Sequence, residues 1–82
     1  MEMIPELYSI ICDTYRSMNR TFDVPLAIIT KDSELKDLGI DDRSMDIILM
    51  NIESRMNVSL PVYGGQEPRY VGDVITMIEY SK

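Results

Sequence analysis

The residues best suited to chemistry stand together in the middle of the chain, where two carboxylates are followed by an arginine and a hydroxyl. They are Asp41, Asp42, Arg43 and Ser44. An apolar segment with helical spacing follows, and it predicts a helix over 43–56 with both aspartates at its N-terminus. Carboxylates there meet free backbone N–H groups and the positive end of the helix dipole. The expected chemistry is therefore helix capping and the placement of negative charge.

Catalysis by these residues is not expected. The chain has no histidine to serve as a base and no glycine loop that would cradle a phosphate, and its adjacent carboxylates are predicted to be solvated. No catalytic residue is assigned, and the chain is predicted not to be an enzyme. A small enzyme is kept as a third, weaker hypothesis, which would need a pocket holding perturbed acidic groups.

Metal and disulfide chemistry are limited by the same composition. Cys12 is the single cysteine, so an intrachain disulfide is impossible, and structural zinc sites built from Cys and His are excluded. The clustered carboxylates lack the loop signature of a dedicated calcium site, and no metal site is predicted. Cys12 falls inside an apolar helical pattern, which predicts a buried, inert thiol.

The composition predicts one small acidic domain spanning residues 1–82. Fourteen acidic and 8 basic residues give a formal charge of −6, which opposes binding to nucleic acid or anionic membranes and permits a basic protein partner. Solubility alone is the other explanation of the charge. Residues 1–11 show no secretory pattern, and no stretch approaches the roughly 20 apolar residues of a membrane span, so we expect a cytoplasmic protein.

Apolar residues at helical spacing predict three firm helices, over 5–18, 43–56 and 71–80. The first has Pro5 in its opening turn and an inward face of Ile4, Leu7, Tyr8, Ile11, Tyr15 and Met18. The inward face of the second helix comprises Met45, Ile48, Leu49, Ile52 and Met56. Its end is bracketed by Asn57 and Pro61. The inward face of the third helix comprises Val71, Val74, Ile75 and Ile78. No run alternates at period two, so the predicted fold class is all-α.

The connection over 19–40 is long but not purely polar. Its apolar residues are expected to fold back over the core: Phe22, Val24, Leu26, Ile28 and Ile29. Within it, residues 32–39 predict a short helical turn that Asp32 or Ser33 would cap and Gly39 would end. The later stretch 62–69 contains Gly and Pro and predicts a loop with at most one turn of helix. Together these elements predict a four-helix bundle with a short or weak third helix.

A gapless series of residues carries the strongest pattern in the chain. It comprises Leu38, Gly39, Asp41, Met45, Ile48, Met50, Ile52 and Glu53. In order and spacing the series resembles the acyl carrier protein family, whose pattern L-G-x-D-S-L precedes an apolar-rich helix ending in an acidic residue. Residues 29–30 and 35–38 resemble the family's approach to this site, and 58–61 and 71–75 resemble its later elements. The resemblance implies a four-helix carrier fold with a long loop after the first helix.

The resemblance also implies a cofactor, and this chain departs from the family at the residue to which that cofactor is attached. In the family, the serine of the pattern is joined through a phosphodiester to 4′-phosphopantetheine, whose thiol carries acyl groups as thioesters. A helix N-terminus suits that phosphate. Asp42 stands at the serine position here, and it has no hydroxyl, so the arm is predicted to be absent. A natural change and an engineered one remain equally open, and an ordinary helix cap is the alternative interpretation of Asp42.

Two further positions bear on loading and docking. Ser44 is the nearest hydroxyl and the less favoured alternative attachment point; its ordinary interpretation is an exposed serine in the first helical turn. Arg43 occupies the place of a leucine that, in the family, helps to dock partner enzymes. The stretch 62–69 replaces a short third helix that borders the family's acyl cavity.

The partners that the resemblance implies are enzymes of fatty-acid or polyketide-type synthesis and a phosphopantetheinyl transferase, each docking through a basic patch. The predicted partner-binding residues are Asp41, Arg43, Asp46, Ile47, Met50 and Glu53. The acidic residues would steer a basic partner, and Ile47 and Met50 would form an apolar centre. Solvated helix ends and ordinary surface apolar residues are the alternatives.

The predicted function is that of a monomeric acyl-carrier-like domain, which would present a tethered acyl group but cannot be loaded at Asp42. The alternative is a carrier-fold interaction or regulatory module that has no covalent arm.

Overall fold

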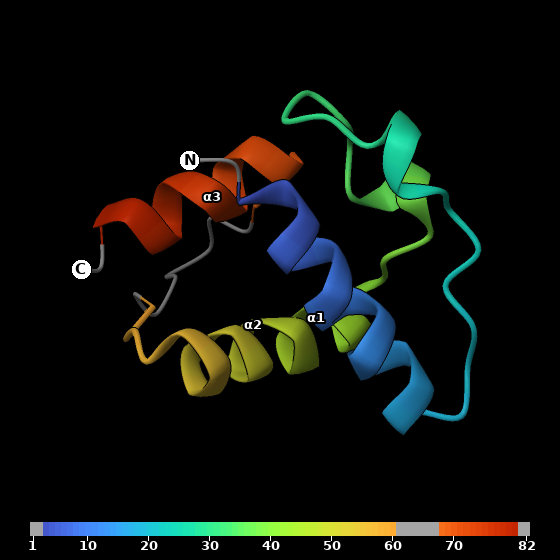
Figure 1. Ribbon diagram of the computed structural model, residues 1–82, viewed down its shortest axis with the longest axis horizontal. Coiled ribbons are helices and arrows are strands. Elements are labelled where there is room, and N and C mark those ends of the chain that lie inside the picture. The colour runs from blue at the N-terminus through green and yellow to red at the C-terminus, as the bar shows by residue number, and fades with distance from the viewer. Residues whose placement is uncertain (1–2, 61–67, 81–82) are drawn as a thin grey trace.

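The computed structural model describes residues 3–60 and 68–80, and the regular structure in these ranges is helical (Figure 1). Three α-helices are present there: α1 (Ile4–Ser17), α2 (Asp42–Met56) and α3 (Val71–Tyr80). Two 3₁₀ helices, η1 (Leu26–Ile28) and η2 (Lys36–Leu38), lie in the connection from α1 to α2. The all-α prediction is confirmed. The turn of helix expected within 62–69 lies almost wholly outside the described residues, so the four-helix bundle stays a prediction.

The first helix buries a wider face than its spacing predicted. Its buried residues are Leu7, Ile10, Ile11, Thr14 and Tyr15. Ile10 and Thr14 were not among the predicted ones, and Ile4, Tyr8 and Met18 are only half-buried. The reason is that α1 is covered on more than one side, because the following connection returns against it. The Tyr8 hydroxyl donates a hydrogen bond of 2.8 Å to the Val24 carbonyl.

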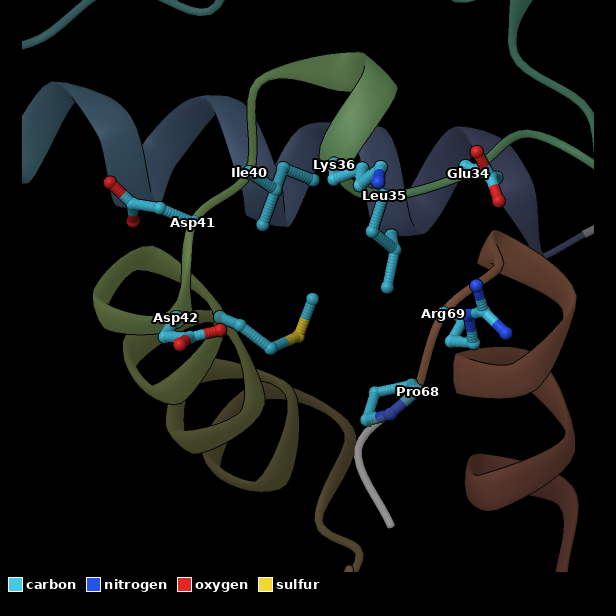
Figure 2. A pocket seen from close by; sticks show the side chains of 9 residues that line it. Glu34, Leu35, Lys36, Ile40, Asp41, Asp42, Pro68 and Arg69 are labelled. Atoms are coloured by element: carbon cyan, nitrogen blue, oxygen red, sulfur yellow. The ribbon is translucent and has the colours of Figure 1, made fainter.

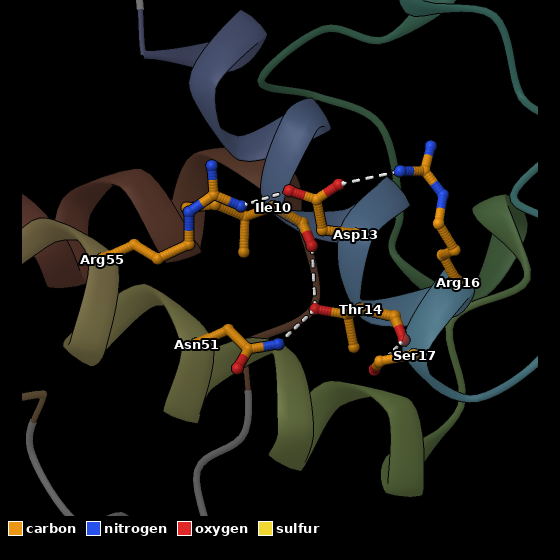
Figure 3. Close-up of polar contacts among 7 residues, drawn as sticks. All are labelled: Ile10, Asp13, Thr14, Arg16, Ser17, Asn51 and Arg55. Carbon is orange, nitrogen blue, oxygen red and sulfur yellow. Dashed lines mark hydrogen bonds and ion pairs between the residues drawn. The ribbon is translucent and has the colours of Figure 1, made fainter.

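Polar side chains join α1 to α2 (Figure 3). The hydroxyl of Thr14, which is fully buried, donates to the Ile10 carbonyl at 2.8 Å and accepts from the Asn51 amide at 2.7 Å. One residue before Thr14, Asp13 forms an ion pair with Arg55 of α2. The two hydrogen bonds offset the cost of taking this hydroxyl out of water, so the polar contact is compatible with the core.

The long connection covers the core with some of its apolar residues but not with all of them. Phe22 and Ile29 are buried, and the Phe22 ring meets the rings of Tyr8 and Tyr15 edge-on at centroid distances of 5.8 and 5.2 Å. Leu26 and Ile28 were also expected to cover the core, and this was wrong. Ile28 is 63% exposed, because η1 turns its side chain toward solvent.

The predicted helical turn over 32–39 is shorter than expected. η2 does end at Gly39, whose φ of 83° lies in the left-handed region that glycine adopts readily. The predicted cap by Asp32 or Ser33 is wrong, because neither side chain caps η2. The Ser33 hydroxyl instead accepts from the Thr30 N–H at 3.0 Å, and the backbone of this segment pairs with the chain before α3.

Backbone hydrogen bonds attach the start of α3 to the connection. The N–H groups of Leu35, Val71 and Gly72 donate to the carbonyls of Arg69, Ser33 and Lys31 at 2.8, 2.9 and 2.8 Å. Glu34 and Tyr70 form an antiparallel bridge. A Cβ on Gly72 would lie 2.9 Å from the Lys31 carbonyl oxygen, so this close approach requires glycine.

The second and third helices bury most, but not all, of the apolar residues that their spacing predicted to face inward. Met45, Ile48 and Ile52 of α2 are buried, as are Val71, Val74 and Ile78 of α3. Met77 of α3 is buried in addition, while the predicted Leu49, Met56 and Ile75 are half-buried. α2 ends at Met56 and is followed by Asn57, whose φ of 55° is left-handed. Asn57 was predicted to bracket this end, and Pro61, predicted to do so with it, lies outside the described residues. No helix within the described ranges has the length and apolar character needed to cross a membrane.

Candidate functional site

The N-terminus of α2 is capped by Asp41, and Asp42 occupies the first helical position. The Asp41 Oδ1 accepts a hydrogen bond of 2.8 Å from the Ser44 N–H, and its backbone is extended at φ −94° and ψ 176°. The interpretation of Asp42 as the cap is therefore wrong, because its neighbour performs that role. Asp42 is exposed. The backbone N–H groups of Asp42 and Arg43 have no hydrogen-bond partner among the described residues.

The hydroxyl of Ser44 is buried, contrary to the expectation of an exposed serine. Its fractional exposure is 0%, and Arg20 Nη1 lies 3.3 Å from Ser44 Oγ as a hydrogen-bond donor. The first turn of α2 faces the end of α1 at this point, and the arginine covers it. An enzyme could not reach this oxygen without opening the contact.

Electrostatics at the cap favour an ionised Asp41. Hydrogen bonds from the Ser44 hydroxyl and then from its backbone N–H lower the pKa of Asp41 below its usual range. Partial desolvation opposes this effect, and the nearby charge of Arg20 adds to it. Arg20 Nη1 lies 3.8 Å from Asp41 Oδ2. The cap is therefore held as a carboxylate by donors that come from two elements.

A cleft of about 180 Å³ opens beside Asp42 (Figure 2). Its lining residues come from η2 and its flanks, from the start of α2 and from the chain before α3: Glu34, Leu35, Lys36, Ile40, Asp41, Asp42, Met45, Pro68 and Arg69. Figure 2 shows Arg69 across the cleft from Asp42. The floor is apolar and the rim is charged, an arrangement that suits a small group with an apolar body.

A small void in the core lies behind the floor of this cleft. Its volume is about 10 Å³, close to the space of one water molecule, and it is lined by apolar residues of all three helices and the connection. The cleft and the void share Leu35, Ile40 and Met45 as walls. One layer of side chains therefore separates the surface cleft from the centre of the core.

Some of the predicted partner-binding residues are exposed on α2, and others make hydrogen bonds that support the local structure. Arg43, Asp46 and Met50 are exposed, and Met50 is 65% accessible. Asp42, Asp46 and Met50 recur every four residues, which places them on one side of α2. Ile47 is half-buried.

Asp41 and Glu53 make hydrogen bonds that support the local structure. The Glu53 carboxylate accepts from the Leu60 N–H at 2.9 Å and so supports the turn after α2. Asp41 caps the helix, as described above. The structure therefore uses both for local order, a use that charge patterning alone could not distinguish from partner steering.

The single cysteine is half-buried rather than buried, which corrects the prediction for Cys12. It packs against the core from the flank of α1, close to Tyr8. Burial first, and the nearby thiol second, raise the pKa of Tyr8. No group of three or more metal-ligating side chains occurs within the described ranges.

Sequence analysis did not find Arg20, Lys36 or Arg69, which the structure brings to the cleft or to its supports. Arg20 follows α1 in an irregular segment, where no periodicity marks a residue as functional. Only the distance between residues 20 and 44, which are 24 positions apart in the chain, makes it relevant.

Comparisons with known proteins add no family assignment. No family model matches the chain, and no curated protein and no solved structure gives a significant match. The resemblance to acyl carrier proteins therefore rests on the residues of the sequence alone.

Proposed function

We propose that this chain is a carrier domain of the acyl carrier type, in a form that cannot take a covalent arm at residue 42. The observation that carries the proposal is the setting of Asp42. This residue is exposed at the first position of α2 and stands on the rim of a cleft with an apolar floor. A tethered group attached there could project to solvent or turn into the cleft.

The first turn of α2 supports this proposal through its backbone. The N–H groups of Asp42 and Arg43 are without partners among the described residues, and they lie at the positive end of the helix dipole. A phosphate attached at residue 42 would meet both features. The gapless carrier-like pattern around this turn, and a fourth helix outside the described residues, belong to the same proposal.

The residues now at the site do not fit the cofactor itself. A phosphodiester requires a hydroxyl, and Asp42 offers a carboxylate. Ser44 does carry a hydroxyl, but its full burial against Arg20 argues against it as a substitute. We therefore derive no step through 4′-phosphopantetheine for the chain as it stands.

The proposed partners are proteins with basic patches, namely acyl-processing enzymes and a phosphopantetheinyl transferase. The exposed side of α2 with Asp42, Asp46 and Met50 supports this choice, because two carboxylates beside an apolar side chain complement a basic surface with an apolar contact. Arg43 adds a positive charge within this surface, which would oppose a strongly basic partner locally.

The decisive experiment restores the hydroxyl. The parent, Asp42→Ser and Asp42→Asn proteins are incubated with a phosphopantetheinyl transferase and coenzyme A, and each intact mass is measured. We expect the mass gain of one phosphopantetheine group in Asp42→Ser only. Asp42→Asn is the matched control, because it removes the charge without supplying a hydroxyl.

The remaining outcomes contradict the proposal in different ways. A gain in the parent would point to Ser44 or another hydroxyl as the attachment point. No gain in any protein would favour the second candidate, a carrier-fold interaction module without an arm. The specific observation behind that candidate is Met50, which is 65% exposed on the same side of α2 as Asp42 and Asp46 and would be available for contact with a partner.

A further inference from the structure

Arg20 connects the end of α1 to the first turn of α2. We propose that Arg20 is a positioning residue, which holds the start of α2 and thereby sets the orientation in which residue 42 is presented to a modifying enzyme. This inference rests on the proposed carrier function. It goes beyond that function by assigning a role to a residue in another element, more than twenty positions before the site.

The Arg20 side chain contacts Ser44 in the first turn of α2. Arg20 Nη1 donates to the Ser44 hydroxyl at 3.3 Å, and the Ser44 N–H donates to Asp41 at 2.8 Å. Since Ser44 is fully buried, its oxygen has little access to water and depends on this donor. The arginine, the serine and the capping aspartate therefore form one continuous polar chain across the helix start.

Arg20 is itself held in place by Tyr15. Its guanidinium carbon lies 5.0 Å from the centre of the Tyr15 ring, and its backbone N–H donates to the Tyr15 carbonyl at 2.8 Å. A planar guanidinium can stack on an aromatic ring and donate in its own plane at the same time, which a lysine ammonium cannot do.

The same tyrosine also contacts the chain that leads into α2. The Tyr15 hydroxyl donates to the Gly39 carbonyl at 2.9 Å, two residues before the cap. Tyr15 and Arg20 thus fix both sides of the chain that enters α2, at Gly39 and at Ser44. Residue 42 lies between these two points, so its direction follows from them.

The test uses the Asp42→Ser protein as the loadable parent and compares Arg20→Ala, Arg20→Lys and Arg16→Ala in that background. Arg16 is the matched control, because it is an exposed arginine at the same end of α1 and, among the described residues, its side chain pairs with Asp13 alone, at 3.7 Å. We expect Arg20→Ala to lower the kcat of the transferase about tenfold with little change in KM, since misplacement of a reacting group acts on the chemical step. Arg20→Lys should recover only part of the rate, and Arg16→Ala should load like its parent.

A second measurement needs no transferase and uses the protein with Asp42 in place. In Arg20→Ala, amide hydrogen exchange at Ser44 and Met45 should rise about fivefold relative to exchange at Ile52, because only the first turn of α2 is loosened. A uniform rise along α2 would indicate general loss of stability and would overturn the positioning role.

The outcomes separate this inference from the function on which it rests. If Asp42→Ser is not loaded at all, the carrier proposal fails, and the exchange measurement still tests Arg20. If Asp42→Ser is loaded but Arg20→Ala matches Arg16→Ala, the positioning role fails alone. A rise in KM with unchanged kcat would make Arg20 a docking charge and would also refute the inference.

Discussion

Two junctions hold the elements of this fold together, and they are built in different ways. Side chains join α1 to α2, through Thr14 with Asn51, Asp13 with Arg55, and Arg20 with the first turn of α2. Backbone groups join the connection to the start of α3, through the paired segments 31–35 and 69–72. The start of α2 lines the cleft with Asp41, Asp42 and Met45, whereas the second junction lines it directly with Glu34, Leu35 and Arg69.

The difference shows where a substitution can act. A side-chain contact can be deleted by one change, and its cost depends on whether the partner is left buried without a hydrogen bond. A backbone contact survives every substitution except one to proline, because all other residues keep both their N–H and their C=O. It can also be broken by forcing the two chains apart, and the close approach at Gly72 makes that possible.

The largest effect is expected at Gly72. In Gly72→Ala the new Cβ would lie 2.9 Å from the Lys31 carbonyl oxygen, which is backbone and cannot turn aside. We expect the free energy of unfolding to fall by about 2–3 kcal/mol, as at other overpacked sites. A shift of the urea midpoint measures this loss.

Gly39→Ala is the matched control for this prediction. Gly39 has open space around its Cβ position but a φ of 83°, so the same substitution there should cost only the left-handed strain of about 1–2 kcal/mol. If Gly72→Ala proved the milder change, the backbone junction would not be the tight contact inferred here.

A smaller effect is expected at the junction of α1 and α2. Thr14→Val keeps the shape of the buried side chain but removes the hydroxyl, which leaves the Asn51 amide without this acceptor. We expect a loss of about 1–2 kcal/mol in the free energy of unfolding.

The double variant Thr14→Val with Asn51→Leu sharpens this prediction. Because both polar partners are then replaced, its loss should be smaller than the sum of the two single losses by about 0.5 kcal/mol or more. Strict additivity would mean that the hydrogen bond between Thr14 and Asn51 contributes nothing to the junction.

The smallest effect is expected from the titration of Asp41. Its pKa is lowered in the folded protein, chiefly by hydrogen bonds from Ser44, and the unfolded chain has a value of about 3.9. The unfolded state therefore binds more protons in this range. The stabilisation that Asp41 contributes is fully present above about pH 4 and is lost as the pH falls through the pKa of Asp41 in the folded protein.

The check is urea unfolding of the parent and Asp41→Asn from neutral pH downward. Asp41→Asn keeps a capping oxygen but cannot be protonated in this range, so its stability should decline less steeply below about pH 4 than that of the parent. Equal slopes in the two proteins would show that the Asp41 carboxylate is not linked to folding.

The sequence by itself determined the features that depend on nearby residues. The apolar stripes of α2 and α3, the glycine that ends η2 and the left-handed Asn57 after α2 are all visible in spacing or residue type. Helical periodicity and capping act over about four residues, so they can be recognised without a fold. The all-α class and the helix that begins at the Asp41-Asp42 pair follow from these signals.

Only the tertiary structure decided which polar groups are buried and which segments form the cleft. Ser44 and Thr14 are fully buried because distant parts of the chain cover them, and Leu26 and Ile28 are exposed because η1 turns away from the core. The pairing of Glu34 with Tyr70, like the contact of Arg20 with Ser44, joins residues far apart in the chain. No local spacing encodes such contacts, because they arise only when whole elements pack together.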